Sequence, residues 1–138
     1  MTTKQLVHVF EVASKDMDGL TDARGQSTKS MLASDAGIEV SEVRVILGYQ
    51  VKGDLTEEEC QRCLYDLFAD PIIEKATYGE PLLSSFQGPP DLAIQVVFKP
   101  GVTDNSAQAA LDGLTTIFEH HADSVVATNM TYAIWGTE

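Results

Sequence analysis

An internal repeat constrains what this chain can fold into. Residues 19–26 read Gly-Leu-Thr-Asp-Ala-Arg-Gly-Gln, and residues 101–108, which lie 82 positions later, read Gly-Val-Thr-Asp-Asn-Ser-Ala-Gln. Each copy follows an apolar run and precedes a segment that can form a helix. Glycine tolerates the backbone angles of a tight turn, and Thr or Asp can accept hydrogen bonds from the first N–H groups of a helix. The repeat therefore predicts a strand, a glycine turn and a helix start, each occurring twice.

A second repeat, at an offset of 83, extends the first. Residues 43–51 and 126–134 both alternate apolar side chains with other side chains, which is typical of a strand with one buried face. At this offset Met130 falls on Leu47 and Tyr132 falls on Tyr49. We therefore expect two related units, residues 6–78 and 92–135, around a pseudo-twofold axis.

The remaining elements follow from local patterns. The sequence predicts apolar strands at residues 6–12 and 92–98 and a short strand at residues 72–78. It also predicts a helix over residues 23–36 that stops at Gly37. Thr56 starts a capping box, and the helix that follows has an apolar stripe of Cys60, Cys63, Leu64, Leu67 and Phe68. A later helix has its own apolar face, made of Ala107, Ala110, Leu111, Leu114 and Phe118.

These patterns predict an α+β fold in which helices cover one mainly antiparallel sheet. The first repeat spans residues 1–78, residues 79–91 are a Pro- and Gly-rich linker, and residues 92–138 hold a second, incomplete repeat. At the repeat offset, residue 138 corresponds to Leu55, so the second copy lacks a counterpart of the residue 56–68 helix and of the residue 72–78 strand. The strand that carries Val126, Met130, Tyr132 and Ile134 then has less cover. We expect either that the chain is a piece of a longer one or that it self-associates, most simply as a dimer.

Composition narrows the function classes. The net charge is −12, and no Lys or Arg follows Lys99, which argues against nucleic acid or an anionic membrane as the main partner. No apolar run reaches the roughly 18 residues that a membrane span needs, and the first residues lack the apolar core of a secretion signal. Two cysteines three positions apart make no disulfide framework, so a reducing cytoplasm is expected.

Three groups of residues are candidates for a catalytic, metal or anion site, and for each of them a structural role is favoured. Cys60 and Cys63 form a C-x-x-C, but both lie on the apolar stripe of a helix, which favours a role in the core over zinc or redox chemistry. His120, His121 and Asp123 could offer metal ligands, although neighbours on a helix point apart. The Gly-x-Thr-Asp turns could hold an anion, but they lack the Lys of a phosphate loop, and a turn with a cap is the favoured interpretation.

Three stretches give the chain a family resemblance. They are Gly19-x-x-Asp22-x-x-Gly25, the run Val43-Arg44-Val45, and residues 67–74, which read Leu-Phe-Ala-Asp-Pro-Ile-Ile-Glu. In this order they resemble the small PurS-type component of phosphoribosylformylglycinamidine (FGAM) synthase, a glutamine-dependent ligase of purine biosynthesis. Residues 98–105 resemble the tandem copy of this component that begins the long-chain forms of that enzyme. Ala23 departs from the pattern, because the small component usually has proline after the aspartate.

The resemblance implies a ferredoxin-like unit that pairs with a second unit, as a dimer or as a tandem duplication. Such a unit carries no chemistry of its own. It bridges the glutaminase and synthetase parts and supports ammonia transfer, while ATP and Mg bind elsewhere in the enzyme. The residues expected at the turns, caps and interface are Gly19, Thr21, Asp22, Gly25, Gly101, Thr103, Asp104, Tyr49 and Tyr132. The alternative is a free-standing sensor or regulatory domain that binds a small molecule between its two repeats.

Overall fold

The computed structural model describes residues 6–15, 22–86, 88–99, 101–118 and 123–137. Within these residues the chain forms five strands, three α-helices, one π-helical turn and one short 3-10 turn. In chain order they are β1 (Leu6–Ser14), α1 (Ala23–Ala36), β2 (Glu42–Gly53), α2 (Glu57–Cys63), the π-helical turn η1 (Leu64–Phe68), β3 (Glu74–Tyr78), the 3-10 turn η2 (Leu83–Ser85), β4 (Leu92–Val97), α3 (Asn105–Ile117) and β5 (Val125–Trp135).

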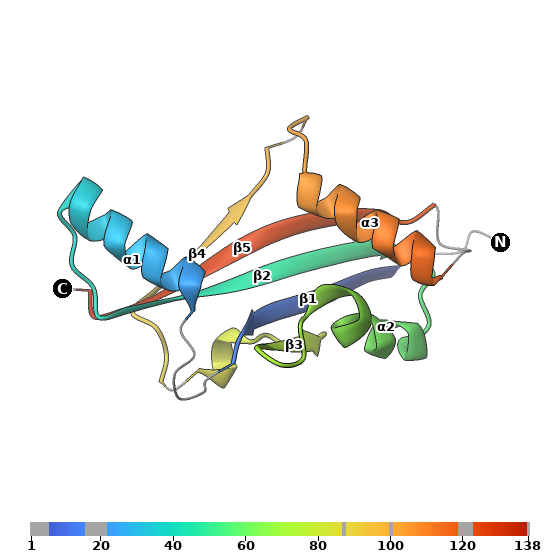
Figure 1. Ribbon diagram of the computed structural model, residues 1–138, viewed down its shortest axis with the longest axis horizontal. Coiled ribbons are helices and arrows are strands. Elements are labelled where there is room, and N and C mark those ends of the chain that lie inside the picture. Colours follow the sequence, from blue (N-terminus) through green and yellow to red (C-terminus); the bar gives the residue numbers. More distant parts are fainter. Residues whose placement is uncertain (1–5, 16–21, 87, 100, 119–122, 138) are drawn as a thin grey trace.

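The strands form one antiparallel sheet in the order β3-β1-β2-β5-β4 (Figure 1). Val43 and Val51 of β2 are an even number of residues apart and share one face of the sheet. Val43 packs with Leu32 of α1, whereas Val51 packs in a cluster with Cys60 of α2 and Leu114 of α3. All three α-helices therefore cover the same face, which confirms the expected two-layer α+β fold.

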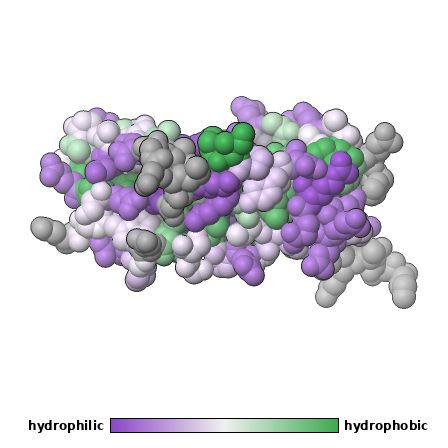
Figure 2. Space-filling model, turned by 60° about the horizontal axis from the view of Figure 1, so that its bottom comes forward, coloured by the Kyte–Doolittle hydropathy of each residue, from purple (hydrophilic) through white to green (hydrophobic). Residues whose placement is uncertain are grey.

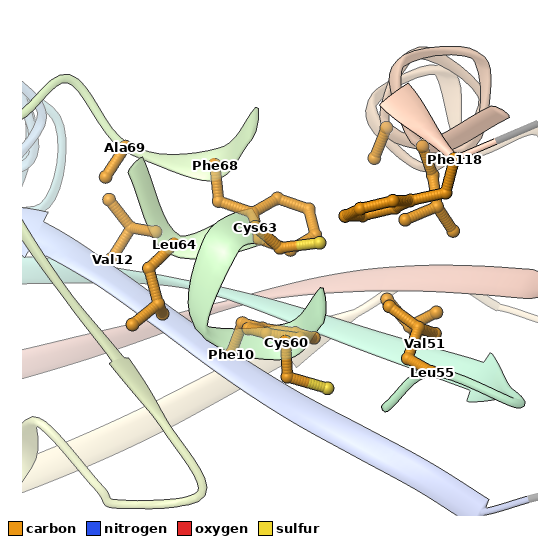
Figure 3. Close-up of a cluster of buried hydrophobic side chains, with 12 residues drawn as sticks. Phe10, Val12, Val51, Leu55, Cys60, Cys63, Leu64, Phe68, Ala69 and Phe118 are labelled. Carbon is orange, nitrogen blue, oxygen red and sulfur yellow. The ribbon is translucent and has the colours of Figure 1, made fainter. Parts of the chain in front are cut away.

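The largest core lies between β1, β2 and the helices α2 and α3 (Figure 3). Phe10 of β1 is fully buried and packs against Phe68, with ring centroids 4.8 Å apart. The buried members are Phe10, Val12, Val51, Leu55, Cys60, Cys63, Leu64, Phe68, Ala69, Ala110, Leu114 and Phe118. This cluster includes both cysteines, so their expected place in the core is confirmed.

The opposite face of the sheet is also partly covered, and the prediction of a single buried face for β2 is wrong. Ile46 is only 1% exposed, because it packs in a second cluster with Leu82 and Phe86, from the segment between β3 and β4. That segment has no periodic pattern. The cover it gives to Ile46 is a long-range contact that alternation along β2 cannot reveal.

The ends of α1 match the predicted bounds. Asp22 caps its N-terminus, and Gly37 ends it in the left-handed conformation with φ +65°. The N–H of Gly37 donates to the carbonyl of Leu32, so the last turn closes on a hydrogen bond. Glycine takes this conformation without the penalty that a Cβ would bring.

The second helix differs from its prediction after Cys63. Thr56 and Glu59 form the expected capping box, with bonds of 3.1 and 2.9 Å. The chain then widens into the π-helical turn η1, closed by the N–H of Ala69, which donates to the carbonyl of Leu64 at 3.0 Å. The predicted single α-helix to Phe68 is therefore incorrect, since the wider turn adds one residue per turn. Strand β3 begins at Glu74, two residues later than predicted, because Asp70 holds a turn before it by accepting the N–H of Ile72.

The two β-α-β segments, β1-α1-β2 and β4-α3-β5, meet at the central β2–β5 ladder. Val43 lies opposite Ile134 and Val51 lies opposite Val126, so the ladder is symmetric about its middle. This register is compatible with a pseudo-twofold axis between β2 and β5. The sequence duplication itself stays a prediction, as does the division of the chain at residues 79–91.

Strand β5 is not an edge of the sheet, since it pairs with both β2 and β4. Its residues Val126, Met130 and Tyr132 are half-buried, and Ile134 is buried. The poorly covered strand in this half of the sheet is therefore β4 rather than β5, because every residue of β4 is exposed.

Candidate functional site

Asp22 joins the start of α1 to the central strand β2. Its Oδ1 accepts the N–H of Gly25 at 2.9 Å, and its Oδ2 accepts the N–H of Val45 at 2.8 Å. The Nε of Arg44 lies 3.6 Å from the same Oδ2, and the Asp22 side chain is only 8% exposed. Both carboxylate oxygens are therefore occupied by contacts that fix the helix on the sheet.

Gly25 allows this close approach. It is the one buried residue of α1, and a Cβ at this position would overlap the carbonyl oxygen of Val43. The obstacle is backbone in the central strand, which cannot move aside as a flexible side chain can. Glycine at this position is therefore required by the distance between α1 and β2.

Asp104 makes the same kind of junction between α3 and β5. Its Oδ1 accepts the N–H of Ala107 at 2.8 Å, and its Oδ2 accepts the N–H of Thr128 at 2.9 Å. The hydroxyl of Thr128 also donates to this carboxylate, at 2.8 Å from Oδ2. The sequence repeat aligns Ala107 with Gly25, and the buried Ala107 shows that the α3–β5 junction has room for a methyl group.

The other predicted turn residues contribute less. Gly101 has φ +84°, the left-handed region that a glycine turn requires, and it is exposed. Thr103 is also exposed, and Asp104 alone caps α3. Gly19 and Thr21 lie outside the described residues.

Tyr49 and Tyr132 are not brought together. Tyr49 stacks on Phe68 in the main core, with ring centroids 4.4 Å apart. Burial raises the pKa of the Tyr49 hydroxyl, and the negative charge of Glu74 raises it further. Tyr132 packs in the separate cluster under α1, where its hydroxyl donates to the sulfur of Met130 at 3.5 Å. The two tyrosines hold matching positions in the sequence repeat but do not form one site.

A cleft of about 220 Å³ lies at the middle of the β2–β5 ladder. Its apolar lining includes Leu47, Met130 and Phe98. Arg24, in the first turn of α1, and Ser106, in the first turn of α3, also line it and are 82 residues apart, as the repeat requires. The cleft is therefore a mainly apolar hollow in which the cation of Arg24 and the hydroxyl of Ser106 lie at matching places. Tyr49, Thr128 and Asn129 add further polar groups to its lining.

The structure also assembles a largely buried cysteine–histidine–tyrosine cluster that the sequence patterns did not indicate. Nδ1 of His8 lies 2.8 Å from the Tyr78 hydroxyl and 3.5 Å from the sulfur of Cys60. His8 is 6% exposed and Cys60 is 0% exposed, whereas Tyr78 at the end of β3 is half-buried. The one sequence feature that could have indicated a role for His8 is that it is a polar residue on the buried side of an alternating strand.

The protonation of the thiols argues against a nucleophilic role for this cluster. Burial raises the pKa of the Cys60 thiol. Burial also raises the pKa of Cys63 to about 12, with the neighbouring Cys60 adding to the shift. The thiolate is the reactive form of cysteine, and both sites disfavour it. The cluster is consistent with packing and hydrogen bonding inside the core.

Within the described residues, no three or more His, Cys, Asp or Glu side chains are arranged to hold a metal ion. His120 and His121 fall outside them, so the structure does not place these candidate ligands. No helix in the described part of the chain is long and apolar enough to cross a membrane. On the face drawn in Figure 2, hydrophobic atoms form separate green patches between purple hydrophilic side chains.

A scan of the chain against protein-family models gives no match, and searches of curated proteins and of solved structures give no significant match either.

Proposed function

We propose that this chain is a non-catalytic accessory and assembly domain of a glutamine-dependent FGAM synthase in de novo purine biosynthesis. In this role it bridges the glutaminase and synthetase parts, supports ammonia transfer between them, and acts in the cytoplasm. ATP and Mg bind elsewhere in that enzyme. The observation that carries the proposal is that the fold uses both oxygens of the motif aspartates, Asp22 and Asp104.

The stretches that carry the family resemblance support a scaffold role. Two of them meet at one point, where Asp22 contacts both Arg44 and Val45. In the third stretch, Asp70 accepts the N–H of Ile72 at 2.9 Å, and its own N–H donates to Glu74 at 2.8 Å. A general acid or base must reach the proton that it transfers. These carboxylates instead bind backbone N–H groups, which favours positioning of elements over chemistry.

The test is reconstitution with the glutaminase and synthetase proteins encoded in the same genome. FGAM formation is measured with glutamine as the nitrogen donor and, separately, with ammonium. We expect the glutamine-dependent rate to require the chain and the ammonium-dependent rate to persist without it. A glutamine-dependent rate that does not change when the chain is omitted would contradict the proposal. So would turnover of glutamine or ATP by the chain alone that a point substitution in it abolishes.

The cleft supports a second candidate function, the binding of a small molecule between the repeats. Its apolar lining and the single guanidinium of Arg24 suit a small amphipathic anion. Titration of a panel of medium-chain carboxylates, followed by NMR chemical shifts, is the test. Saturable shifts at Leu47 and Met130 that disappear in Arg24→Glu, but not in the exposed control Lys52→Glu, would favour this function over the scaffold.

A further inference from the structure

The two outer strands next to the central ladder occupy matching places in the sheet but differ sharply in cover. Phe10 of β1 lies opposite Tyr49, and Ile94 of β4 lies opposite Tyr132, the residue that the repeat aligns with Tyr49. Phe10 is 0% exposed, whereas Ile94 is 44% exposed. The difference arises because α2 and η1 cover β1, and β3 pairs with its outer edge.

Strand β4 is an edge of the sheet, and it is apolar on both of its faces. Leu92, Val96 and Val97 are 46%, 51% and 62% exposed, and Phe98, just beyond the strand, is 48% exposed. The other edge strand, β3, is half-buried along its length and carries Glu74 and Lys75. Exposed edges without charge are open to pairing with another strand, and proteins usually block them. Strand β4 has no such block between Asp91 and Lys99.

The positions of the charges show what can pair with this edge. Asp91 and Lys99 are the nearest charged residues on either side, and Gln95 lies midway between them. Asp91 is held in place at the strand end, because its Oδ2 accepts the N–H of Gly136 at 2.7 Å and that of Thr137 at 3.2 Å. Lys99 is exposed. A strand with this arrangement is complementary to itself when one copy is turned end for end.

We propose that β4 pairs antiparallel with β4 of a second copy of this chain, with Gln95 opposite Gln95 on the twofold axis. This register places Asp91 of each copy opposite Lys99 of the other copy, on the same face as the paired glutamines. On the helix-covered face it places Ile94 opposite Val96 and Leu92 opposite Phe98. Every cross-strand pair is then apolar, amide to amide, or of opposite charge, and the two sheets continue into one.

The total charge of the chain favours this edge as the place of contact. Two bodies with a net charge of −12 repel each other, so a self-contact is most favourable where acidic groups are few. Lys99 is the last cation in the sequence, and this register lets it face an aspartate of the other copy. Twofold contacts of this kind close on themselves and give a dimer rather than a fibre.

The test is analytical ultracentrifugation of the purified chain over a concentration series up to about 100 µM. We expect a monomer–dimer equilibrium. Gln95→Lys and Gln95→Glu each place like charges directly opposite, and each should raise the dimer dissociation constant about tenfold or more. An equimolar mixture of the two variants places opposite charges on the axis and should restore the dimer. Gln95 lies on an exposed strand, so both variants are expected to fold.

Matched controls are Gln61→Lys and Gln61→Glu, which make the same changes on the exposed surface of α2 and should leave the equilibrium unchanged. A strictly monomeric wild-type chain would overturn the proposal. A dimer that tolerates both charges at Gln95, or two variants that do not recombine in the mixture, would also overturn it, because the contact would then lie elsewhere. These measurements use the chain alone, so their outcome is independent of the FGAM synthase reconstitution.

Discussion

Leu47 in β2 lies directly opposite Met130 in β5, and these are the two residues that an offset of 83 aligns in the sequence. A twofold axis between them exchanges the pair Val43–Ile134 with the pair Val126–Val51, both of which occur in the ladder. The sequence offset and the strand register are independent observations that agree. The middle of the ladder is therefore the point around which the two aspartate junctions and the cleft are placed.

The aspartate junctions predict a large and matched loss of stability. Asp22→Ala and Asp104→Ala each remove a helix cap and leave a strand N–H without its acceptor. We expect each to lower the free energy of unfolding by about 2–4 kcal/mol, measured by urea denaturation. Asp54→Ala, on an exposed residue, is the control and should change it by less than about 0.5 kcal/mol. Similar small values for all three variants would contradict the structural role of the junctions.

Glycine substitutions should separate close backbone contact from helix propensity. Gly25→Ala places a methyl group against the carbonyl oxygen of Val43, so we expect a loss of about 1–3 kcal/mol despite the gain in helix propensity. Gly113→Ala in α3 meets only the end of the Leu67 side chain, which can move. Its cost should be clearly smaller, or it should stabilise by up to about 1 kcal/mol. Thermal unfolding of the two variants side by side measures which substitution costs more stability. A larger loss for Gly113→Ala than for Gly25→Ala would contradict the close contact between α1 and β2.

Replacing both cysteines should cost stability rather than metal. Cys60→Ala with Cys63→Ala removes two fully buried sulfur atoms from the main core. We expect a loss of about 1–3 kcal/mol in the free energy of unfolding. Metal analysis of the purified wild-type chain accompanies the measurement. Stoichiometric zinc that disappears in the double variant would disprove the core role.

The raised pKa of Cys63 predicts a specific alkaline weakening. Its pKa is about 12 in the folded chain against an ordinary value of 9.0, so the folded state binds the thiol proton more tightly. The resulting stability is complete below about pH 9 and is lost as the pH rises towards 12. Cys63→Ala lacks this dependence, so its deficit relative to wild type should shrink between pH 8 and about pH 10.5. Urea denaturation across this range measures the difference, and a constant deficit would contradict the assignment.

Local patterns in the sequence predicted most of the elements. The bounds of α1, the capping box at Thr56 and the cap at Asp22 depend on contacts between residues close in sequence. Alternation located β2 and β5, because a strand that packs on one side repeats every two residues. The repeat identified Asp22 and Asp104 as matching caps. It could not show that each carboxylate also binds a strand N–H more than 20 residues away.

The tertiary structure decided the features that depend on distant parts of the chain. Leu82 and Phe86 bury Ile46 from a segment without periodicity, and His8, Cys60 and Tyr78 meet only when β1, α2 and β3 pack together. The exposure of β4 likewise follows from which elements cover which strand, not from its own composition. A sequence determines local structure through neighbouring residues, whereas burial, sheet order and open edges are set by contacts between segments far apart, which periodicity and capping do not encode.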